Sequence, residues 1–524
     1  MVQRRRIFLS ALFTGVLLGV LCMPNLTQVR AAPKRTPTPA VTPTPVPTLP
    51  PGSYYVSVGG SDTNPGTLAA PWRHIQYALD RVVAGSTVSV MNGVYNEFVT
   101  FRNSGSASDG YVTLQNYSGQ SPVIDATGLP IRGETGLVNI VNSQYIKLIG
   151  FEIRNLKAGG VGSAFPQGIS VRGNGAFIEV RNNKVHDVEN SCKRCGAHGI
   201  AVYGRDPNAS IHDLLIDGNE VYNGKFGWSE SLVLNGNVEK FTVSNNIVHD
   251  NDNIGIDFIG FEGENPNPAV DRARDGTVTG NLVYNINSYG NPAYGTDRSA
   301  DGIYVDGGTN IVIERNIVHH SNLGIELASE HAGKNTSYIT LRNNFIYSNT
   351  QAGIAIGGYD TRRGSTEHCV IVNNTLYNNF TQGDWGSELY IQYDTRNNIL
   401  KNNLIFANAY LKYMESWSPV MTANTVDRNL YFATGGGSNG TWIWKGVTYT
   451  TFSAYQSASG NDVASLIGLD PLLVDAGAGN LHISLGSPAI NAGENLSSDQ
   501  MGTLDIDGDP RIIGSTVDIG ADER

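Results

Sequence analysis

Residues 301–329 read DGIYVDGGTNIVIERNIVHHSNLGIELAS, and this stretch decides the fold. It holds a glycine phrase, Gly-Ile-x-apolar, at 302–305 and again at 324–327. Between them, at 316–319, lies an asparagine phrase: asparagine, any residue, an apolar residue and an aromatic residue or histidine. Apolar positions alternate over only three to five residues, which is typical of short β-strands separated by glycine and asparagine turns.

Both phrases recur along the chain. The asparagine phrase begins at Asn183, Asn219, Asn246, Asn281, Asn316, Asn344, Asn374, Asn403 and Asn429, with spacings of 26 to 36 residues. The glycine phrase begins at Gly168, Gly199, Gly255, Gly302, Gly324 and Gly353, with looser copies at 232–234 and 389–391. Such a period predicts a solenoid whose rungs stack apolar residues into one continuous core. We expect the recurring asparagine to take a left-handed turn conformation, with its amide hydrogen-bonded along the stack.

Composition excludes several classes of protein. The chain has 524 residues, of which 16% are charged, with 61 glycines and 22 prolines. It favours Gly, Asn, Thr, Val, Ile and Tyr over helix formers, which argues against a mainly helical enzyme. From Tyr54 onward it carries 30 basic and 47 acidic residues, a net charge of −17. We therefore expect neither nucleic acid nor an anionic membrane as a partner.

The N-terminal segment predicts export. Residues 1–32 combine three arginines at 4–6, an apolar run at 7–23 and a plausible cleavage site at 29–31, as in a signal peptide. A retained anchor is the alternative. Residues 33–53 form a Thr/Pro-rich linker, which favours an extended spacer. No other stretch is apolar enough to cross a membrane, so we expect a secreted or cell-surface protein with no span after cleavage.

Three cysteines follow the signal segment. Cys192 and Cys195 form one C-x-x-C, and because a second pair is missing, a zinc site there is not expected. A local disulfide or two reduced thiols remain open. Cys369 lies in an apolar strand pattern and is expected in the core.

Both ends of the repeat region support a family resemblance. Tyr54-Tyr55-Val56-Ser57, Pro71-Trp72 and a helical piece at 75–83 precede the repeats, and 470–472, 486–490 and 518–523 follow them. The chain resembles the right-handed parallel β-helix (pectate-lyase-like) superfamily, and its tail resembles the choice-of-anchor Q domain. This implies an all-β right-handed parallel β-helix at 54–465 with a short N-terminal capping helix, and a C-terminal module at 466–524. The superfamily includes hydrolases, lyases, epimerases, adhesins and non-enzymes, so the reaction stays open.

Insertions mark one face of the expected solenoid. They flank the glycine-phrase strand on both sides, near 187–198, 260–275, 286–301, 329–336 and 358–367. Insertions of this kind indicate a binding face. We therefore expect a groove floored by this strand row and walled by these loops.

Three carboxylates point outward from successive rungs of that row: Asp257, Asp306 and Glu326. Rungs stack about 4.8 Å apart, so Asp306 and Glu326 should lie about 8 Å apart, and Asp257 and Glu326 about 10 Å apart. Mutual repulsion should raise at least one pKa, and a separation of roughly 6.5–9.5 Å suits an inverting glycosidase. The sequence thus predicts a glycoside hydrolase with this trio as acid and base, and no cofactor.

Further residues are candidates for binding substrate. Tyr304, between Asp257 and Glu326, is placed to orient a water molecule or a sugar. The other candidates are Trp228, Arg298, His331, Trp385 and Tyr390. His331 and His198 stand at strand margins, where surface or turn roles are expected. Residues 505–509 resemble a calcium loop only loosely, and an acidic turn is expected there.

Three other interpretations stay open. The trio can be ordinary solvated surface. Clustered carboxylates can also bind Ca²⁺, as in the calcium-dependent polysaccharide lyases of this fold, which need a lysine or arginine base. No lysine occupies an outward strand position, and Arg172 lies three rungs from the acids. The third interpretation is that the protein is a non-catalytic glycan-binding or adhesion module. In every case the expected partner is a polysaccharide and the expected state a monomer.

Overall fold

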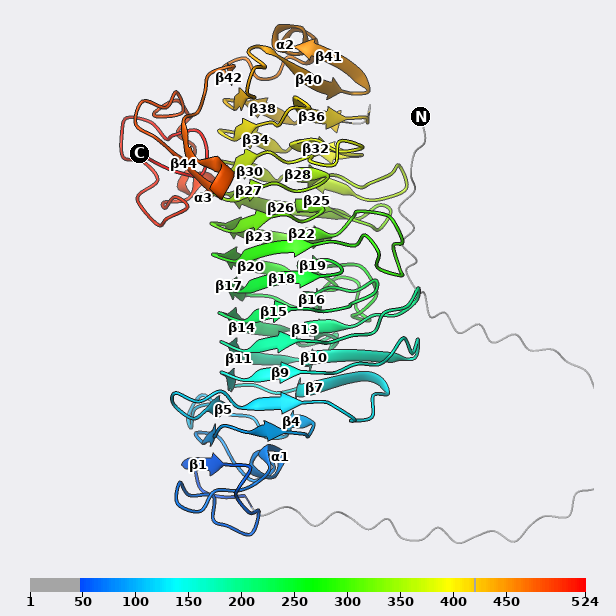
Figure 1. The fold of residues 1–524 in the computed structure, drawn as a ribbon, viewed down its shortest axis with the longest axis vertical. Helices are drawn as coiled ribbons and strands as arrows, with labels where there is room; N and C mark the ends of the chain where they lie inside the picture. Colours follow the sequence, from blue (N-terminus) through cyan, green and yellow to red (C-terminus); the bar gives the residue numbers. More distant parts are fainter. Residues whose placement is uncertain (1–47, 419–420) are drawn as a thin grey trace, which may run out of the picture.

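The computed structural model describes residues 48–418 and 421–524. Three long sheets of parallel strands wind into a right-handed β-helix, seen from the side in Figure 1. One sheet has 16 strands and the other two have 13 each. The fold expected from the repeats is confirmed. The signal-peptide segment 1–32 and the linker up to residue 47 lie outside the described residues.

The bounds of the elements are as follows. Sheet 1 holds β1 (Ser53–Val56), β2 (Thr87–Val90), β5 (Val112–Asn116), β8 (Ile146–Ile149), β11 (Gly175–Arg181), β14 (Ile211–Asp217), β17 (Phe241–Ser244), β20 (Arg274–Thr279), β23 (Thr309–Glu314), β26 (Asn335–Arg342), β29 (Ser365–Glu367), β30 (Val370–Val372), β33 (Thr395–Arg396), β34 (Ile399–Lys401), β37 (Met421–Thr422) and β38 (Thr425–Asp427). Sheet 2, which carries the asparagine phrase, holds β3 (Val94–Tyr95), β6 (Val123–Asp125), β9 (Glu152–Arg154), β12 (Lys184–His186), β15 (Glu220–Tyr222), β18 (Ile247–Asn251), β21 (Leu282–Ile286), β24 (Ile317–His319), β27 (Phe345–Tyr347), β31 (Thr375–Tyr377), β35 (Leu404–Phe406), β39 (Leu430–Phe432) and β42 (Leu466–Ile467). Sheet 3, which carries the glycine phrase, holds β4 (Val99–Phe101), β7 (Gly133–Val141), β10 (Ala164–Gly173), β13 (His198–Gly204), β16 (Leu232–Gly236), β19 (Ile256–Ile259), β22 (Asp301–Asp306), β25 (Leu323–Ala328), β28 (Ala352–Ile356), β32 (Leu389–Ile391), β36 (Lys412–Ser416), β40 (Asn439–Trp444) and β41 (Val447–Thr451).

The core fills the inside of the solenoid. In the rung that begins with β22, Ile303, Val305, Ile311 and Val318 point inward and are fully buried. Ile303 pairs with Ile325 of the next rung in register, so like residues stack along the axis. Since burial of such a side chain contributes about 1.5–3 kcal/mol, the repeated apolar positions supply most of the driving force for folding.

An asparagine ladder joins successive rungs. The side chain of each asparagine accepts a hydrogen bond from the backbone N–H of the asparagine one rung earlier, from Asn183 through to Asn429. The side-chain amides are linked in the same direction. The expected stacking is confirmed, but the left-handed conformation belongs to the preceding residue, such as Arg315 with φ 55° before Asn316. The ladder asparagine follows this turn residue in the sequence, and its side-chain amide is buried.

Aromatic rings form a second stack along sheet 2. The rings of His186, Tyr222, His249, Tyr284, His319 and Tyr347 lie face to face, with neighbouring centroids 4.6 to 5.2 Å apart. Because the faces cover one another, the edges of these rings are what the surface presents. This set stabilises the wall, and the four inner rings of the stack have both faces covered by a neighbouring ring.

Each end of the solenoid is closed differently. At the N-terminal end, α1 (Ile75–Leu79) covers the core. It stops before the expected residue 83 because Val82 and Val83 are β-branched and Gly85 turns the chain with φ 79°. At the other end lie the β40–β41 hairpin and α2 (Phe452–Ser459) (Figure 1).

The chain from β43 (Leu473–Asp475) onward forms a small module against the flank of the solenoid (Figure 1). It contains β43, a 3₁₀ turn (Ala476–Ala478), β44 (Asn480–Ile483) and α3 (Ser498–Met501). Asn343, Asn373 and Asn402, the left-handed residues of three successive rungs, donate their side-chain amides to carbonyl groups of this module. Among the helices of the described residues, none is long and apolar enough to cross a membrane.

Candidate active site

The candidate site lies on the outward face of sheet 3. Asp257 of β19 pairs with Tyr304 of β22, and Tyr304 pairs with Glu326 of β25, so these three side chains form one column. Asp306 lies two residues beyond Tyr304, in the adjacent column, where it pairs with Ala328. The outward column expected from strand alternation is therefore correct in register.

The carboxylates are far more buried than an open groove floor would allow. Asp257 is 2% exposed, Asp306 4% and Glu326 0%. The insertion after β19 lies against this face, where Glu262 accepts from Asn235 Nδ2 of β16 (3.2 Å). Its end is fixed by Arg272, which donates to the carbonyls of Gly308 (2.8 Å) and Asn335 (3.1 Å). The expected insertions are present, but the one after β19 lies against the strand row instead of only beside it.

Each of the three acids has a different set of partners. Asp306 Oδ1 accepts a hydrogen bond from the backbone N–H of Glu330 at 2.7 Å. Glu326 Oε1 accepts one from Gln392 Nε2 at 2.5 Å. Asp257 Oδ1 is buried and has no hydrogen-bond partner among the described residues. These differences allow the three carboxyl groups to take different roles.

The site contains two further carboxylates, which strand alternation alone did not reveal. Glu230, just before β16, is 7% exposed, whereas Glu262, in the loop after β19, is exposed and accepts from Asn235 Nδ2 at 3.2 Å. The signal for Glu262 was its place in the longest insertion, as part of Glu262-x-Glu264. Glu230 precedes residues 232–234, one of the looser copies of the glycine phrase, so the sequence pattern gave no clear sign of a strand there.

Burial and mutual repulsion raise the pKa of two of these acids, Asp257 and Asp306. Desolvation raises the pKa of Asp257 well above its usual value, and the charges of Glu230 and Asp306 add to the shift. Desolvation likewise raises the pKa of Asp306, with Glu330 and Glu262 as the next contributors. Both carboxyl groups are therefore poised to hold a proton at pH values where ordinary aspartates are ionised.

His198 takes a buried position instead of the expected surface or turn role. Its exposed fraction is 1%, and its Nε2 lies 2.6 Å from the hydroxyl of Tyr203 while Nδ1 lies 3.0 Å from the carbonyl of Glu230. Burial lowers the pKa of His198 to about 4. It is thus a neutral residue that ties β13 to the segment before β16.

The aromatic candidates flank the acids along the solenoid axis. Trp228, 41% exposed, precedes β16, whereas Trp385 precedes β32 and lies 5.9 Å from the ring of Tyr390. These two tryptophans are five strands apart in sheet 3, which is about 24 Å at the usual strand spacing. Arg298 is stacked over the ring of Tyr289, with its guanidinium carbon 4.1 Å from the centroid. The structure thus spreads these candidates along the face instead of gathering them.

Basic side chains near the acids are engaged elsewhere. Arg363 donates to the carbonyl oxygen of Glu330 at 3.0 Å, and Arg272 is bound to the two carbonyls described above. Arg172 pairs with Glu134 at 3.2 Å, away from the acids. Among the described residues, no lysine or arginine forms an ion pair with Asp257, Asp306 or Glu262.

Two groups of side chains have the spacing of metal ligands. The ligand atoms of Glu262, Asp306 and His331 all lie within 4.8 Å of one another, and so do those of His482, Asp507 and Asp522 in the C-terminal module. At 505–509 the carboxylate of Asp505 instead accepts the backbone N–H groups of residues 507, 508 and 509. That segment is an acidic turn closed on itself, as expected.

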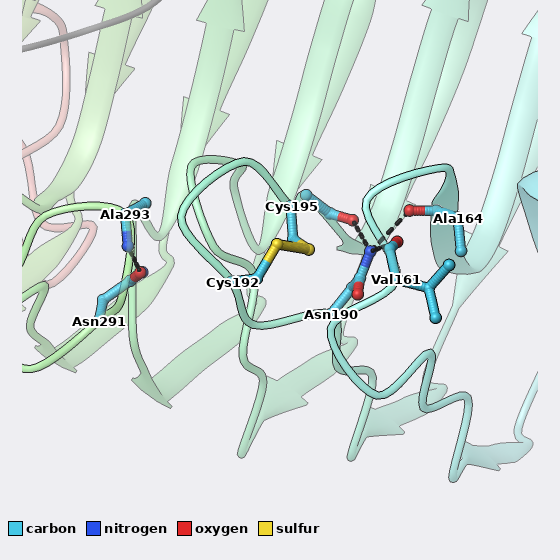
Figure 2. The surroundings of a disulfide bond; sticks show 8 residues. Val161, Ala164, Asn190, Cys192, Cys195, Asn291 and Ala293 are labelled. Atoms are coloured by element: carbon cyan, nitrogen blue, oxygen red, sulfur yellow. Dashed lines mark hydrogen bonds between the residues drawn. A yellow bond between two sulfur atoms is a disulfide. The ribbon is translucent and has the colours of Figure 1, made fainter.

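A disulfide closes one loop beside sheet 3. Cys192 and Cys195 are bonded within the segment before β13, which settles the choice between disulfide and thiols (Figure 2). The adjacent Asn190 donates its amide to the carbonyls of Val161 (3.1 Å) and Ala164 (2.6 Å), which ties this loop to the preceding rung. Cys369 is buried, as its strand pattern indicated.

Comparisons with known proteins agree with this architecture. Residues 54–210 match a family model described as a Pel9A-like right-handed β-helix region, and residues 269–454 match one described as a right-handed β-helix region. A solved structure of XylC in complex with xylose covers 90% of this chain and 98% of its own, with 11% identity and a TM-score of 0.50. The protein is therefore a right-handed parallel β-helix protein.

A sequence relative identifies the family. The uncharacterized protein YwoF of Bacillus subtilis (strain 168) is 38% identical over 441 residues, which cover 84% of this chain and 92% of YwoF. The chain belongs to the YwoF family. The pectate lyase PEL9 of Emericella nidulans is 34% identical over a shorter stretch of 113 residues, which is 19% of this chain and 27% of that enzyme.

Proposed function

We propose that the protein is an exported glycoside hydrolase that cleaves an extracellular polysaccharide. The observation that carries this proposal is the column on sheet 3 in which Asp257 and Glu326 lie on either side of Tyr304. Two carboxylates that face one substrate from unlike surroundings are what acid–base cleavage of a glycosidic bond requires. The signal segment and the Thr/Pro spacer support export.

Asp257 is the general acid in this proposal. Its buried carboxyl has a raised pKa, chiefly through desolvation and the neighbouring Glu230, so it retains a proton to give to the leaving oxygen. Glu326 is the general base, and its hydrogen bond from Gln392 orients the carboxylate. Tyr304, between them and 3% exposed, would position the attacking water.

The rung spacing bears on stereochemistry. Asp257 and Glu326 are two rungs apart, so their backbones are separated by about 10 Å. That distance is close to the range of an inverting hydrolase and about twice the separation of a retaining pair. Trp228 on one side and Trp385 with Tyr390 on the other would then stack against sugar rings, and Arg298 would contact the chain from its loop.

A polysaccharide lyase is the second candidate. The similarity to PEL9 and the Pel9A-like family model favour it. Lyase chemistry needs a free basic side chain at the reacting carbon, whereas Arg272 and Arg363 are bound to backbone carbonyls and Lys334 is stacked on the ring of Phe261. This favours the hydrolase. We also propose that residues 466–524 correspond to a choice-of-anchor Q-like module, which is supported by the packing of the part from β43 onward on the flank of the solenoid.

The test is activity on a panel of neutral and uronate polysaccharides, with and without EDTA. The wild type is compared with Asp257→Asn, Glu326→Gln and, as a control in the exposed loop between β13 and β14, Asn208→Ala. Release of reducing ends without ultraviolet-absorbing products, lost in the first two variants alone, is the expected result. EDTA-sensitive formation of unsaturated, absorbing ends would replace the hydrolase with the lyase, and no product on any substrate would favour a binding module.

A further inference from the structure

The cluster at the edge of the acidic site has a geometry that polysaccharide cleavage does not need. Glu262, Asp306 and His331 come from three separate segments: the insertion after β19, the end of β22 and the loop after β25. Their ligand atoms nevertheless meet within 4.8 Å of one another. Three possible metal ligands from separate segments of the sequence thus lie close enough together to bind one cation.

Two buried polar atoms at or near this cluster have no hydrogen-bond partner among the described residues. His331 Nε2 is buried without a hydrogen-bond partner among the described residues. Asp257 is 2% exposed, and its Oδ1 also lacks a partner. Asp257 pairs with Tyr304, two residues before Asp306 on the same outward face, so this unpartnered carboxylate lies one rung from the cluster. Buried polar atoms are normally satisfied, and a bound ion is one of the groups that satisfies them.

The charge balance points the same way. Glu262 and Asp306 form no ion pair with any lysine or arginine of the described residues, although Glu262 accepts from Asn235 and Asp306 from the Glu330 amide. Arg363 and Lys334, the basic residues that act on His331, are stacked on the rings of Tyr359 and Phe261. A divalent cation would neutralise the two carboxylates.

We propose that Glu262, Asp306 and His331 bind a divalent transition-metal ion of the Zn²⁺ or Mn²⁺ type. One imidazole and two carboxylates form a ligand set that suits such ions, whereas Ca²⁺ takes six to eight oxygen ligands. Three protein ligands leave coordination positions open. Because Glu262 is exposed, the ion has a route from solvent. The site does not depend on the proposed hydrolase activity.

The experiment measures binding of the metals themselves to the full chain. Protein freed of metal with EDTA is titrated with Zn²⁺, Mn²⁺, Ca²⁺ and Mg²⁺ by calorimetry, and the Co²⁺ form is examined by absorption spectroscopy. The variants are Glu262→Gln, an exposed position that should not disturb folding, and His331→Ala. His482→Ala is the matched control, because it removes a ligand from the other three-residue group, in the C-terminal module.

The expected result is one Zn²⁺ or Mn²⁺ bound at this site, with little binding of Ca²⁺ or Mg²⁺. Loss of an outer-shell partner costs about 10- to 100-fold in metal affinity, so loss of a direct ligand in Glu262→Gln or His331→Ala should cost more. His482→Ala should leave this binding unchanged. The proposal is overturned if the wild type binds no transition metal, or if binding survives both ligand variants with circular dichroism showing intact folds. It is also overturned if His482→Ala alone abolishes binding.

Discussion

Replacement of Asn316 by alanine tests whether the asparagine ladder holds the rungs together. The Asn316 side chain accepts from the backbone N–H (3.0 Å) and side-chain amide (2.9 Å) of Asn281. Its own amide donates to the carbonyls of Val278 and Glu314 and to the side chain of Asn344, each at 3.0 Å. All of these bonds vanish in Asn316→Ala.

The loss of stability comes from the buried backbone groups that lose a hydrogen-bond partner when the Asn316 side chain is removed. The buried N–H of Asn281 loses its acceptor, which costs about 1–3 kcal/mol for an unsatisfied buried donor. The Val278 carbonyl loses a donor as well, a loss of about 1 kcal/mol. The Asn281 amide keeps its bond to the Val243 carbonyl at 3.0 Å, which limits the damage. We expect a total loss of about 2–4 kcal/mol in the free energy of unfolding.

Urea denaturation followed by circular dichroism measures this loss. Asn208→Ala is the control, because Asn208 is exposed in a turn and should change stability by less than about 0.5 kcal/mol. If Asn316→Ala unfolds at the same urea concentration as this control, the ladder does not stabilise the solenoid and the reasoning fails.

Three further predictions concern buried charges. Burial raises the pKa of Glu388 to about 8, so the folded protein binds this proton more tightly than the unfolded chain. Thermal melts should therefore show stability falling as pH rises from about 4.5 to about 8, and Glu388→Gln should flatten that part of the curve. Asp257→Asn should raise the free energy of unfolding at pH 7 by about 1 kcal/mol or more while abolishing activity, since its raised pKa makes the ionised form unfavourable; equal or lower stability in urea would contradict this. Arg511 is 1% exposed and donates to the carbonyls of Ala521, Asp518 and Gly520. Arg511→Ala should therefore lower the free energy of unfolding by about 3–5 kcal/mol and make the C-terminal module sensitive to proteolysis. A variant as resistant to protease as the wild type would argue against that role.

The solenoid was predictable because its rules are local. Phrases such as Gly302–Val305 and Asn316–His319 carry strand alternation and turn residues in each copy, and a regular period leaves few alternatives to stacking. The same alternation assigned Asp257, Tyr304 and Glu326 to one outward column, since a period of two decides which side each residue takes. The turn conformation was misplaced by one residue because either of two adjacent positions before each strand suits a left-handed turn.

The environment of the acids was not predictable from that pattern. Exposure of Asp257 depends on how the insertion 260–273 folds, and nothing in strand periodicity encodes the path of a loop. Glu262 meets Asp306 and His331 only because this insertion returns across sheet 3. Glu230 was missed because its rung has only a loose copy of the phrase. Loops thus determine both the burial and the full membership of the site.

The most direct test of the proposed reaction is the origin of the oxygen at the new chain end. The polysaccharide cleaved in the panel is treated in ¹⁸O-labelled water, and its products are analysed by mass spectrometry and by NMR of the first anomer formed. We expect the proposed hydrolysis to leave one solvent oxygen at each new reducing end, to invert the configuration at the cleaved carbon and to give no product with Glu326→Gln. Products without solvent oxygen and with an unsaturated end would contradict it.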